Sequence, residues 1–377
     1  MATKYLYLDD EETSVVEPFR DRVVAQANDL TIDIEHPGPY KSNFSALFRK
    51  LKEYRGLILD WRLDVAVDAN KTKFDLRAAA VAQEIRTTET EKKTKPIPIV
   101  IWSQQDRLKN SFSGDTTSHD LFDSVYKKEF IIENAELVHD QLISLAKGYE
   151  TIAEFSKKRS AFKLSDLLNT EEDYVDIRLQ EYFKTKSRAV HDIARILKHG
   201  LLDRPGLLID EKRLAAKLGI DKDNSKGWLK LVSKLRKYKY SGPFHDGWQR
   251  WWAYGIEKEW WFSISGQNAS LSLLNAQERV QILKQATQIR TLVAASPIIP
   301  QYHTRFYTIC EHYQKPLDPV DGVIIAEKPE PWQERRYLSL DAALKNLGND
   351  IFPDATETER LKTIRKGMSN INAPKKR

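Results

Sequence analysis

The first 132 residues of the chain alternate short apolar runs with longer amphipathic ones. The apolar runs have the length of buried strands and lie at 5–8, 30–34, 56–59, 97–102 and 123–126. The amphipathic runs have helical spacing and lie at 14–28, 43–54, 75–91 and, as a short helix, 119–122. This succession of βα units predicts an α/β domain with a five-stranded parallel sheet and helices on both of its faces.

From Glu133 onwards the pattern is mainly helical. Apolar residues at spacings of three and four predict a long helix over 138–152, and helical spacing continues over 173–199 as far as a breaker at 203–206. Beyond it the pattern predicts helices at 210–219, 225–238 and 276–295, with β-hairpins in the aromatic stretch at 240–264.

These changes of pattern divide the chain into five predicted segments. They are an α/β domain at 1–132, a helical extension and linker at 133–200, a helix-turn-helix-like region with the aromatic hairpin at 201–275, an α-rich region at 276–369 and a basic tail at 370–377. The expected fold is one α/β domain followed by a mainly α region, whose middle part is similar to a winged helix.

Composition narrows the class of protein. With 41% hydrophobic and 30% charged residues, the 377-residue chain has the composition of two or three globular domains. No apolar run approaches the roughly 20 residues of a membrane span, and no signal peptide opens the chain, so we expect no membrane partner. A single cysteine, Cys310, excludes an internal disulfide framework and a cysteine-rich zinc site, and it fits a cytoplasmic protein.

The net charge of +6 is unevenly distributed along the chain. Residues 1–150 have 21 Lys and Arg against 26 Asp and Glu, a net charge of −5, whereas residues 151–377 have 39 against 28, a net charge of +11. The basic excess indicates either a polyanion bound near the second half or a helical surface whose lysines keep the protein in solution.

Polar side chains follow four of the predicted strands at the same end. Asp9-Asp10-Glu11 follows the first strand, Asp60 the third, Ser103 the fourth and Lys127-Lys128 the fifth. Because the carboxyl ends of parallel strands share one edge of a doubly wound sheet, these groups are predicted to converge there. Clustered carboxylates favour Mg²⁺, a lysine adds a positive charge for phosphoryl oxygens, and a serine hydroxyl donates a hydrogen bond. The set fits phosphoryl transfer to a carboxylate.

Residues 3 to about 150 resemble the receiver domain of two-component response regulators. The resemblance rests on four motifs, Tyr-Leu-Tyr-Leu-Asp9-Asp10-Glu-Glu, Gly-Leu-Ile-Leu-Asp60, Ile-Val-Ile-Trp-Ser103 and Val-Tyr-Lys-Lys128-Glu-Phe. It implies a flavodoxin-like sheet with the strand order 2-1-3-4-5 and a phosphoacceptor at Asp60. It also implies a switch hydroxyl at Ser103, a site lysine at Lys128 and Mg²⁺ ligands at Asp9, Asp10, Asp60 and the backbone carbonyl of Arg62. Lys127 is the alternative lysine if the register differs by one residue.

The surroundings of the acceptor depart from the family pattern. No Met-Pro turn follows Asp60, and Glu129 stands where the family has a proline after the lysine. Bulky or polar groups lie beside the acceptor and the hydroxyl, namely Trp61, Arg62, Gln104 and Gln105. They predict a slowly hydrolysed phosphoryl group. The alternative is that Trp61 points into the domain core and Arg62 into solvent, which would leave the path of water open. Lys128, as a lysine at a strand end, is predicted to be solvated and to add little to stability.

Residues 213–237 have the spacing of a helix-turn-helix with a turn longer than usual. Four lysines on or near one face of its second helix are candidate contacts to nucleic-acid phosphates, namely Lys226, Lys230, Lys234 and Lys237. The aromatic hairpin would serve as a wing. The alternative is a helical core domain with an exposed lysine-rich face, and this is the interpretation we favour.

Two further features of the second half have a structural and a functional interpretation. Five of the nine tryptophans lie between Trp248 and Trp261, which indicates an interior hairpin or a protein interface. His191 lies on a predicted helix, but its neighbours are not those of a phosphorelay histidine, so we expect a structural role.

We therefore predict a cytoplasmic response regulator whose Asp60 accepts a phosphoryl group from a histidine kinase in a Mg²⁺-dependent reaction. Its second half would transmit the signal, or absorb it as a phosphate sink, through contact with a second response regulator or an effector protein. The variant features resemble receivers of bacterial conflict and phage-defence operons. The alternative is a DNA-binding transcriptional regulator that uses residues 205–265. We expect no enzymatic activity beyond self-catalysed phosphotransfer and autodephosphorylation. A homodimer is compatible with the sequence.

Overall fold

The computed structural model describes residues 2–40, 44–63, 77–104, 119–157, 163–185, 189–266, 270–347 and 351–372. Contacts within the chain divide it into two compact units. The first unit comprises Met1–Asn169, Tyr182–His199 and Ser241–Trp248, and the second comprises Thr170–Glu181, Gly200–Tyr240 and Gln249–Arg377. Neither unit is therefore one continuous stretch of sequence.

The first unit is built on a five-stranded parallel sheet with the order β2-β1-β3-β4-β5. Its strands are β1 (Thr3–Leu8), β2 (Leu30–Glu35), β3 (Gly56–Leu59), β4 (Ile99–Ser103) and β5 (Ser124–Lys127). All neighbouring strands pair in parallel, with β1 between β2 and β3 and with β5 at an edge. The predicted strand order and strand direction are confirmed.

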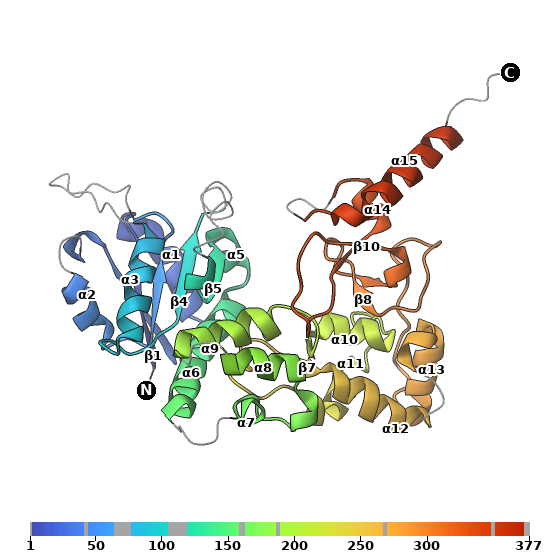
Figure 1. Cartoon of the computed structure of the whole chain (residues 1–377), viewed down its shortest axis with the longest axis horizontal. Helices are drawn as coiled ribbons and strands as arrows, with labels where there is room; N and C mark the ends of the chain where they lie inside the picture. Colours follow the sequence, from blue (N-terminus) through green and yellow to red (C-terminus); the bar gives the residue numbers. More distant parts are fainter. Residues whose placement is uncertain are drawn as a thin grey trace. The chain divides into compact units, whose positions relative to one another are not determined.

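Helices cover both faces of this sheet (Figure 1). They are α1 (Thr13–Val24), α2 (Phe44–Leu51), α3 (Ala78–Thr90), α5 (Lys128–Glu133) and α6 (Ala135–Lys157). Apolar residues of α2 and α3 pack on one face, whereas α1 and α6 contact each other on the opposite face. The short helix predicted at 119–122 is a single 3₁₀ turn, His119–Leu121. A longer helix does not form because the backbone N–H of Asp123 already bonds the carbonyl of Ile99 in β4.

The central strands direct alternate side chains to the two faces of the sheet. Leucines and isoleucines at alternate positions of β1, β3 and β4 form one core with α2 and α3. Tyr5 points to the other face, where its hydroxyl donates to the Leu142 carbonyl of α6 over 2.7 Å. Tyr5 pairs with Gly56 across β1 and β3, and a Cβ at Gly56 would lie 2.0 Å from the Tyr5 ring. Gly56 is therefore needed to make room for that ring.

Two helices and one distant segment complete the first unit. The helices are α7 (Leu164–Leu168) and α9 (Val190–Leu197), and α9 contacts α6. The segment Ser241–Trp248 packs on α6, where a Cβ at Gly148 would lie 2.2 Å from the ring of Phe244. The side-chain amide of Gln141 also donates to the Gly247 carbonyl over 3.2 Å. A segment from the later part of the chain thus becomes part of the first unit.

The second unit is mainly helical. Its helices are α10 (Glu211–Leu218), α11 (Trp228–Lys234), α12 (Trp261–Ser265), α13 (Ala276–Thr287), α14 (Leu340–Leu344) and α15 (Thr358–Asn372), and α8 (Ile177–Thr185) begins in this unit. Short strands pair antiparallel, β6 (Leu208–Ile209) with β7 (Trp251–Trp252), β8 (Thr308–Ile309) with β9 (Pro316–Leu317) and β10 (Gly322–Ile324) with β11 (Tyr337–Ser339). A mainly helical region with small antiparallel hairpins was predicted, and it is found.

The aromatic stretch is extended only in its first part. The two tryptophans of β7 pair with β6, and the backbone N–H of Tyr240 bonds the carbonyl of Arg250 as in a hairpin. The strands expected over 253–264 are wrong, because a π-helical segment (Gly255–Trp260) and α12 occupy this range. Trp260 and Trp261 are both buried. Side chains of adjacent residues on a helix point about 100° apart, so both rings can lie on the buried side, whereas on a strand they would point to opposite faces.

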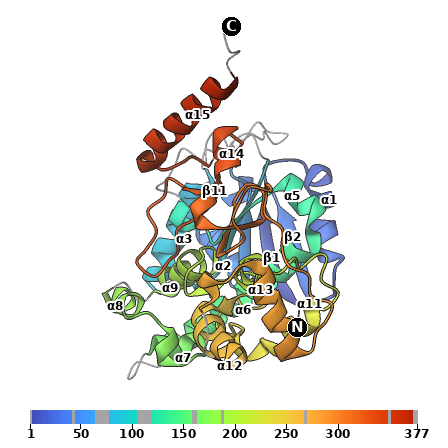
Figure 2. The same ribbon diagram turned by 90° about the vertical axis from the view of Figure 1, so that its right-hand side faces the viewer.

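The described chain ends in α15, which extends away from the rest of the second unit (Figure 1, Figure 2). Leu361 of this helix packs in an apolar cluster that includes Cys310, Leu338 and Ala342. Residues 373–377 of the predicted basic tail lie outside the described residues. Among the helices of the described chain, none is both long and apolar enough to cross a bilayer.

Candidate functional site at the carboxyl edge of the sheet

Three carboxylates converge at the carboxyl edge of the parallel sheet. Leu8 ends β1 and pairs with Leu59 at the end of β3, so Asp9 and Asp10 follow one strand and Asp60 follows its neighbour. Oxygen atoms of the three side chains lie within 4.8 Å of one another, and all three residues are buried. The structure therefore brings together the carboxylates that the strand ends singled out.

Hydrogen-bond donors fix two of these carboxylates. The backbone N–H of Glu11 donates to Asp9 Oδ1 over 2.9 Å, and the Tyr7 hydroxyl donates to Asp9 Oδ2. The backbone N–H of Arg62 donates to Asp60 Oδ2 over 3.0 Å. Burial and the nearby Asp9 raise the pKa of Tyr7 well above its ordinary value, so the phenol remains a donor. Asp9 and Asp60 are thus oriented by the protein itself.

Lys128 supplies the positive charge of the site. It is the first residue of α5, directly after β5, and only 2% of its surface is exposed. Its Nζ lies 2.9 Å from Asp9 Oδ2, 2.9 Å from Glu11 Oε2 and 3.9 Å from Asp60 Oδ1. Burial lowers the pKa of Lys128, but the charges of Asp9 and Asp60 outweigh burial and raise it overall. The ammonium therefore persists inside the cluster.

Of the two neighbouring lysines, Lys128 points into the cluster and Lys127 is exposed. The expectation that Lys128 is solvated is wrong, because α5 begins at this residue and its side chain is enclosed between three acidic groups. Its contribution to stability is accordingly that of a buried ion pair and not that of a surface lysine.

Ser103 reaches the same edge from β4. It pairs with Lys127 at the end of β5 and is fully buried. Its Oγ has no hydrogen-bond partner among the residues that the structure describes. A buried hydroxyl without a partner costs free energy, so an acceptor oxygen brought to this edge would be stabilised by it.

Two residues that sequence reasoning did not connect with the lysine complete the site. Glu11 binds the Lys128 ammonium with one carboxylate oxygen, and its other oxygen accepts a hydrogen bond of 3.3 Å from the side-chain amide of Gln104. The signal for Glu11 was its place in the acidic run after β1. Gln104 carries no comparable signal beyond its position directly after Ser103.

The two tryptophans next to Asp60 and Ser103 along the chain are buried against the two faces of the sheet. Trp61 is 2% exposed and packs in the core shared with α2 and α3, its ring 6.1 Å from that of Phe122. Trp102 is buried on the other face, with its ring 5.2 Å from that of Tyr7. The expectation that Trp61 adds bulk beside Asp60 is therefore wrong, because Trp61 points into the core. Gln105 lies outside the described residues.

The lysines singled out in the second half are exposed on and around α11, namely Lys226, Lys230, Lys234 and Lys237. The helix is fixed to α10 because the Trp228 indole N–H donates to Glu211 Oε1 over 2.7 Å. Lys237 lies 3.5 Å from Glu259, and within the described part of the chain no ion pair is found for the other three lysines. The result is a row of positive charge on a helix with a fixed position in its unit.

His191 has the contacts of a structural histidine. Its Nδ1 lies 3.1 Å from the Tyr149 hydroxyl and its Nε2 lies 2.8 Å from the carbonyl of Asp120. Burial, together with the nearby charge of Arg86, lowers its pKa to about 3. The ring is therefore neutral at physiological pH and occupied at both nitrogens, which supports the structural interpretation.

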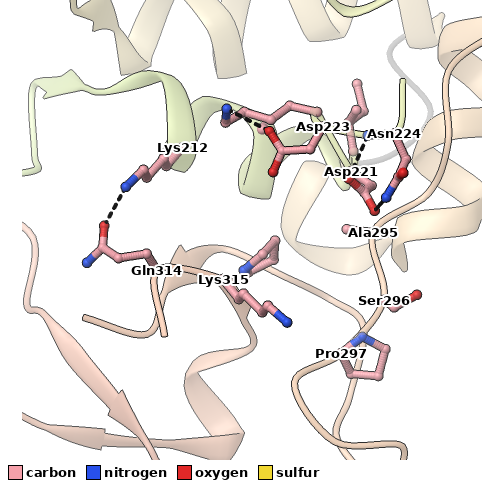
Figure 3. A pocket seen from close by; sticks show the side chains of 13 residues that line it. Lys212, Asp221, Asp223, Asn224, Ala295, Ser296, Pro297, Gln314 and Lys315 are labelled. Carbon is pink, nitrogen blue, oxygen red and sulfur yellow. Dashed lines mark hydrogen bonds and ion pairs between the residues drawn. The ribbon is translucent and has the colours of Figure 1, made fainter. Parts of the chain in front are cut away.

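A pocket of about 280 Å³ lies in the second unit, beside the turn that follows α10 (Figure 3). Several of its polar groups bond one another. Lys212 donates to Gln314 over 3.1 Å, Lys222 pairs with Asp223 over 3.0 Å, and Asn224 donates to Asp221 over 2.8 Å. None of the residues predicted to carry the chemistry lines it. The carboxylate cluster of the first unit is thus the better candidate for a reactive site.

Comparisons with known proteins give only distant likenesses. A scan against models of protein families finds no match, and neither does a comparison of the sequence with curated proteins. Among solved structures, an adenylate cyclase from Rhodopirellula baltica matches with 13% identity and a TM-score of 0.31, over 42% of this chain and 99% of its own. A response regulator receiver domain protein from Clostridium thermocellum matches with 12% identity and a TM-score of 0.23, over 35% of this chain and 93% of its own.

The RcsB response regulator of Salmonella typhimurium matches with 12% identity and a TM-score of 0.24, over 51% of this chain and 98% of its own. Because all these TM-scores are low, the description of the fold rests on the strand order and on the geometry of the site. On that basis the first unit is a parallel sheet with the order 2-1-3-4-5 and has a buried triad of carboxylates, Asp9, Asp10 and Asp60, at its carboxyl edge.

Proposed function

We propose that Asp60 accepts a phosphoryl group from the phosphohistidine of a kinase, and that the first unit is the receiver domain of a response regulator. The observation that carries the proposal is the buried cluster of Asp9, Asp10 and Asp60 with the Lys128 ammonium 3.9 Å from Asp60. Four charged side chains are costly to bury together, and such clusters concentrate at functional sites. The cluster therefore supports a site that handles a highly charged group.

The phosphohistidine carries a proton on its other ring nitrogen, so that the kinase histidine leaves as neutral imidazole and Asp60 needs no proton transfer. A carboxylate oxygen of Asp60 attacks the phosphorus in line, the P–N bond to the kinase histidine breaks, and its electron pair stays on the imidazole nitrogen. Asp60 becomes an acyl phosphate. Lys128 would offset the charge on the phosphoryl oxygens, and the buried Ser103 hydroxyl would donate a hydrogen bond to one of them.

The acidic triad fits Mg²⁺. Asp9, Asp10 and Asp60 offer the hard oxygen ligands that this ion prefers, and by the resemblance the backbone carbonyl of Arg62 would be a further ligand. Bound there, the ion would offset negative charge on the phosphoryl group and on the attacking carboxylate. Tyr7 holds Asp9 in a fixed orientation, so this ligand needs little rearrangement on binding.

The second unit would then transmit the signal or absorb it. By the resemblance the phosphoryl donor is a histidine kinase, and a response regulator whose acyl phosphate is not relayed acts as a phosphate sink for that kinase. A second response regulator or an effector protein would be the partner that reads the phosphorylated state. This part of the proposal rests on the resemblance and on the site, and not on a contact in the second unit.

Beryllofluoride and a small phosphodonor test the proposal without the kinase. With Mg²⁺, beryllofluoride should raise the melting temperature of the wild type and leave Asp60→Asn unchanged. Acetyl phosphate with Mg²⁺ should add one phosphoryl group to the wild type in intact-mass spectra and none to Asp60→Asn. The matched control is Asp29→Asn, at an exposed carboxylate outside the triad, which should respond as the wild type does. An equal response from Asp60→Asn would refute the assignment.

A second candidate function, binding of duplex DNA, is favoured by one observation. Lys226, Lys230 and Lys234 are exposed around α11, and the structure describes no acidic partner for them. Phosphate contacts of this kind make binding weaken as salt rises, with a slope of about −0.9 per contact. The triple Lys→Gln variant at these positions should therefore weaken binding and lower the slope by about 3. A duplex titration by fluorescence anisotropy at several salt concentrations measures both.

The control for this titration removes the same charge elsewhere in the unit. Lys328, Lys362 and Lys366 are exposed lysines outside α10 and α11, and their triple Lys→Gln variant should keep the wild-type slope. If the wild type binds no duplex at low salt, or if both triple variants lose affinity equally, then α11 is not a DNA-binding helix. The face would then be the solvated surface of a helical domain.

A further inference from the structure

Two carboxylates of different accessibility hold the Lys128 ammonium. Asp9 is buried, and its oxygens also accept hydrogen bonds from Tyr7 and from the backbone N–H of Glu11. The Glu11 side chain is 19% exposed and lies at the rim of the cluster. One of its oxygens is 2.9 Å from the ammonium, and the other accepts the 3.3 Å hydrogen bond from Gln104. Of the two partners, Glu11 is the one whose carboxylate can turn to water.

We propose that Glu11 is a positioning residue, which holds Lys128 in the resting state and releases it when Asp60 carries a phosphoryl group. This inference rests on the proposed function of Asp60. In the structure the ammonium is 3.9 Å from Asp60 Oδ1, beyond hydrogen-bond distance, while its contact with Glu11 is 2.9 Å. Glu11 thus acts through the lysine and sets how strongly the site takes up a phosphoryl group.

Charge explains why Glu11 is the group that leaves. A phosphoryl group brings a charge of about −1.5 to −2 to Asp60, next to an ammonium that is already shared. Its oxygens and the Glu11 carboxylate then compete for Lys128 and repel each other. Asp9 is held inside the buried cluster by its other donors, Tyr7 and the backbone N–H of Glu11, whereas the Glu11 side chain lies at the rim and is 19% exposed.

Release of Glu11 also breaks its hydrogen bond to Gln104. Gln104 directly follows Ser103, the last residue of β4, so the bond ties the end of that strand to the lysine site. A phosphoryl group on Asp60 would be communicated to Gln104 through Lys128 and Glu11. This route is separate from the hydroxyl of Ser103.

The test measures the apparent affinity for beryllofluoride at saturating Mg²⁺, by thermal-shift titration of the full chain. Glu11→Gln should raise this affinity about fivefold, because a competitor for Lys128 is removed. Glu12→Gln removes the same charge from the exposed neighbouring residue and should change the affinity less than about twofold. Glu11→Asp keeps the charge on a side chain one methylene shorter, so it should behave like Glu11→Gln if the contact with Lys128 is what counts.

A double-mutant comparison tests the link to Gln104. Gln104→Ala alone should raise the affinity by a smaller factor, since Glu11 then loses the hydrogen bond from the Gln104 amide. In the Glu11→Gln background the same change should have no further effect. Three outcomes would each overturn the inference. The first is an equal affinity of Glu11→Gln and Glu12→Gln for beryllofluoride, and the second is a wild-type affinity of Glu11→Asp. The third is that the effects of Glu11→Gln and Gln104→Ala multiply in the double variant.

The outcome also separates this inference from the proposed function. If the wild type shows no beryllofluoride response that depends on Asp60, the proposed function fails and the role of Glu11 fails with it. If that response is present and the Glu11 variants match their controls, only the positioning role is refuted.

Discussion

Replacing Lys128 with methionine tests how the first unit carries its buried charge. Methionine has a similar length and no charge, so the variant keeps most of the packing and removes the ammonium. Asp9 and Asp60 remain buried in the variant, and Glu11 loses its contact with the lysine. The expected result is a large loss of stability confined to the first unit.

The magnitude follows from the distances. At an effective dielectric constant of about 20, an ammonium 2.9 Å from a carboxylate is attracted by about 6 kcal/mol, and one 3.9 Å away by about 4 kcal/mol. The cost of taking the ammonium out of water offsets most of this attraction. Removing one member of a buried pair still costs about 3 to 5 kcal/mol, because the remaining charge stays buried. We expect Lys128→Met to lower the free energy of unfolding by about 3 kcal/mol.

Hydrogen exchange in the full chain reports the stability of the first unit by itself. At the amides of β1 and β3, a loss of 3 kcal/mol corresponds to exchange about a hundredfold faster. Lys127→Met, at the exposed neighbour, should stay within about 0.5 kcal/mol of the wild type. Millimolar Mg²⁺ should restore part of the loss in Lys128→Met, because the cation replaces the missing charge. Equal exchange in the two variants would show that Lys128 is solvated, as its sequence position had suggested.

Three further changes have signs that the structure determines. The wild type should be more stable than Lys128→Met by a constant amount from pH 7 to about 10, and this difference should shrink at higher pH. The reason is that the pKa of Lys128 is raised in the folded state, so the stabilising charge is lost only at high pH. Urea titrations at several pH values measure the difference in the free energy of unfolding. Gly56→Ala should destabilise the first unit by about 2 kcal/mol or more, since its Cβ would meet the buried Tyr5 ring at 2.0 Å. Gly367 on α15 has open space around it, so Gly367→Ala should stabilise its helix by up to about 1 kcal/mol. Hydrogen exchange measures both effects. In the unfolded chain His191 takes up a proton below about pH 6.5, whereas in the folded chain it does so only near pH 3. The free energy of unfolding of the wild type, measured relative to His191→Gln, should therefore fall by up to about 2 kcal/mol between pH 7 and pH 5.

The sheet and its reactive edge were predictable because parallel strands impose a simple geometry. The central strands of the first unit, β1, β3 and β4, are short and largely apolar, and the last residue of each fixes which side chains reach the carboxyl edge. Asp9, Asp60 and Ser103 could therefore be placed together from their positions after three separate runs. The pairing of Leu8 with Leu59 shows the register on which that inference depended.

The depth of individual side chains at that edge was not predictable. Lys127 and Lys128 are the same residue type at adjacent positions, and only the start of α5 decides which of them is enclosed. Trp61 follows the acceptor, yet it packs against Phe122 in the core and leaves the acceptor side to other groups. Local pattern gives the position of a residue along an element, whereas the neighbouring elements determine what covers its side chain.

The second unit gave weaker signals for a different physical reason. Several of its strands are only two residues long, so the partner across the pairing, and not a local alternation, creates them. The run from Tyr240 to Trp261 has the composition of strands, but after β7 it is helical, and Trp260 and Trp261 are buried there. Aromatic composition indicates burial, and burial is compatible with either kind of element.

Two residues of the acidic run after β1 contact the same lysine, which its composition alone did not indicate. Asp9 and Glu11 are two residues apart and both reach Lys128, one from inside the cluster and one from its rim. A site with only buried partners would hold the ammonium permanently, and a site with only exposed partners would leave it solvated. Under the proposed function, one fixed and one releasable carboxylate would keep Lys128 close to Asp60 and still let its ammonium move to an arriving phosphoryl group, as a reversible phosphoacceptor requires.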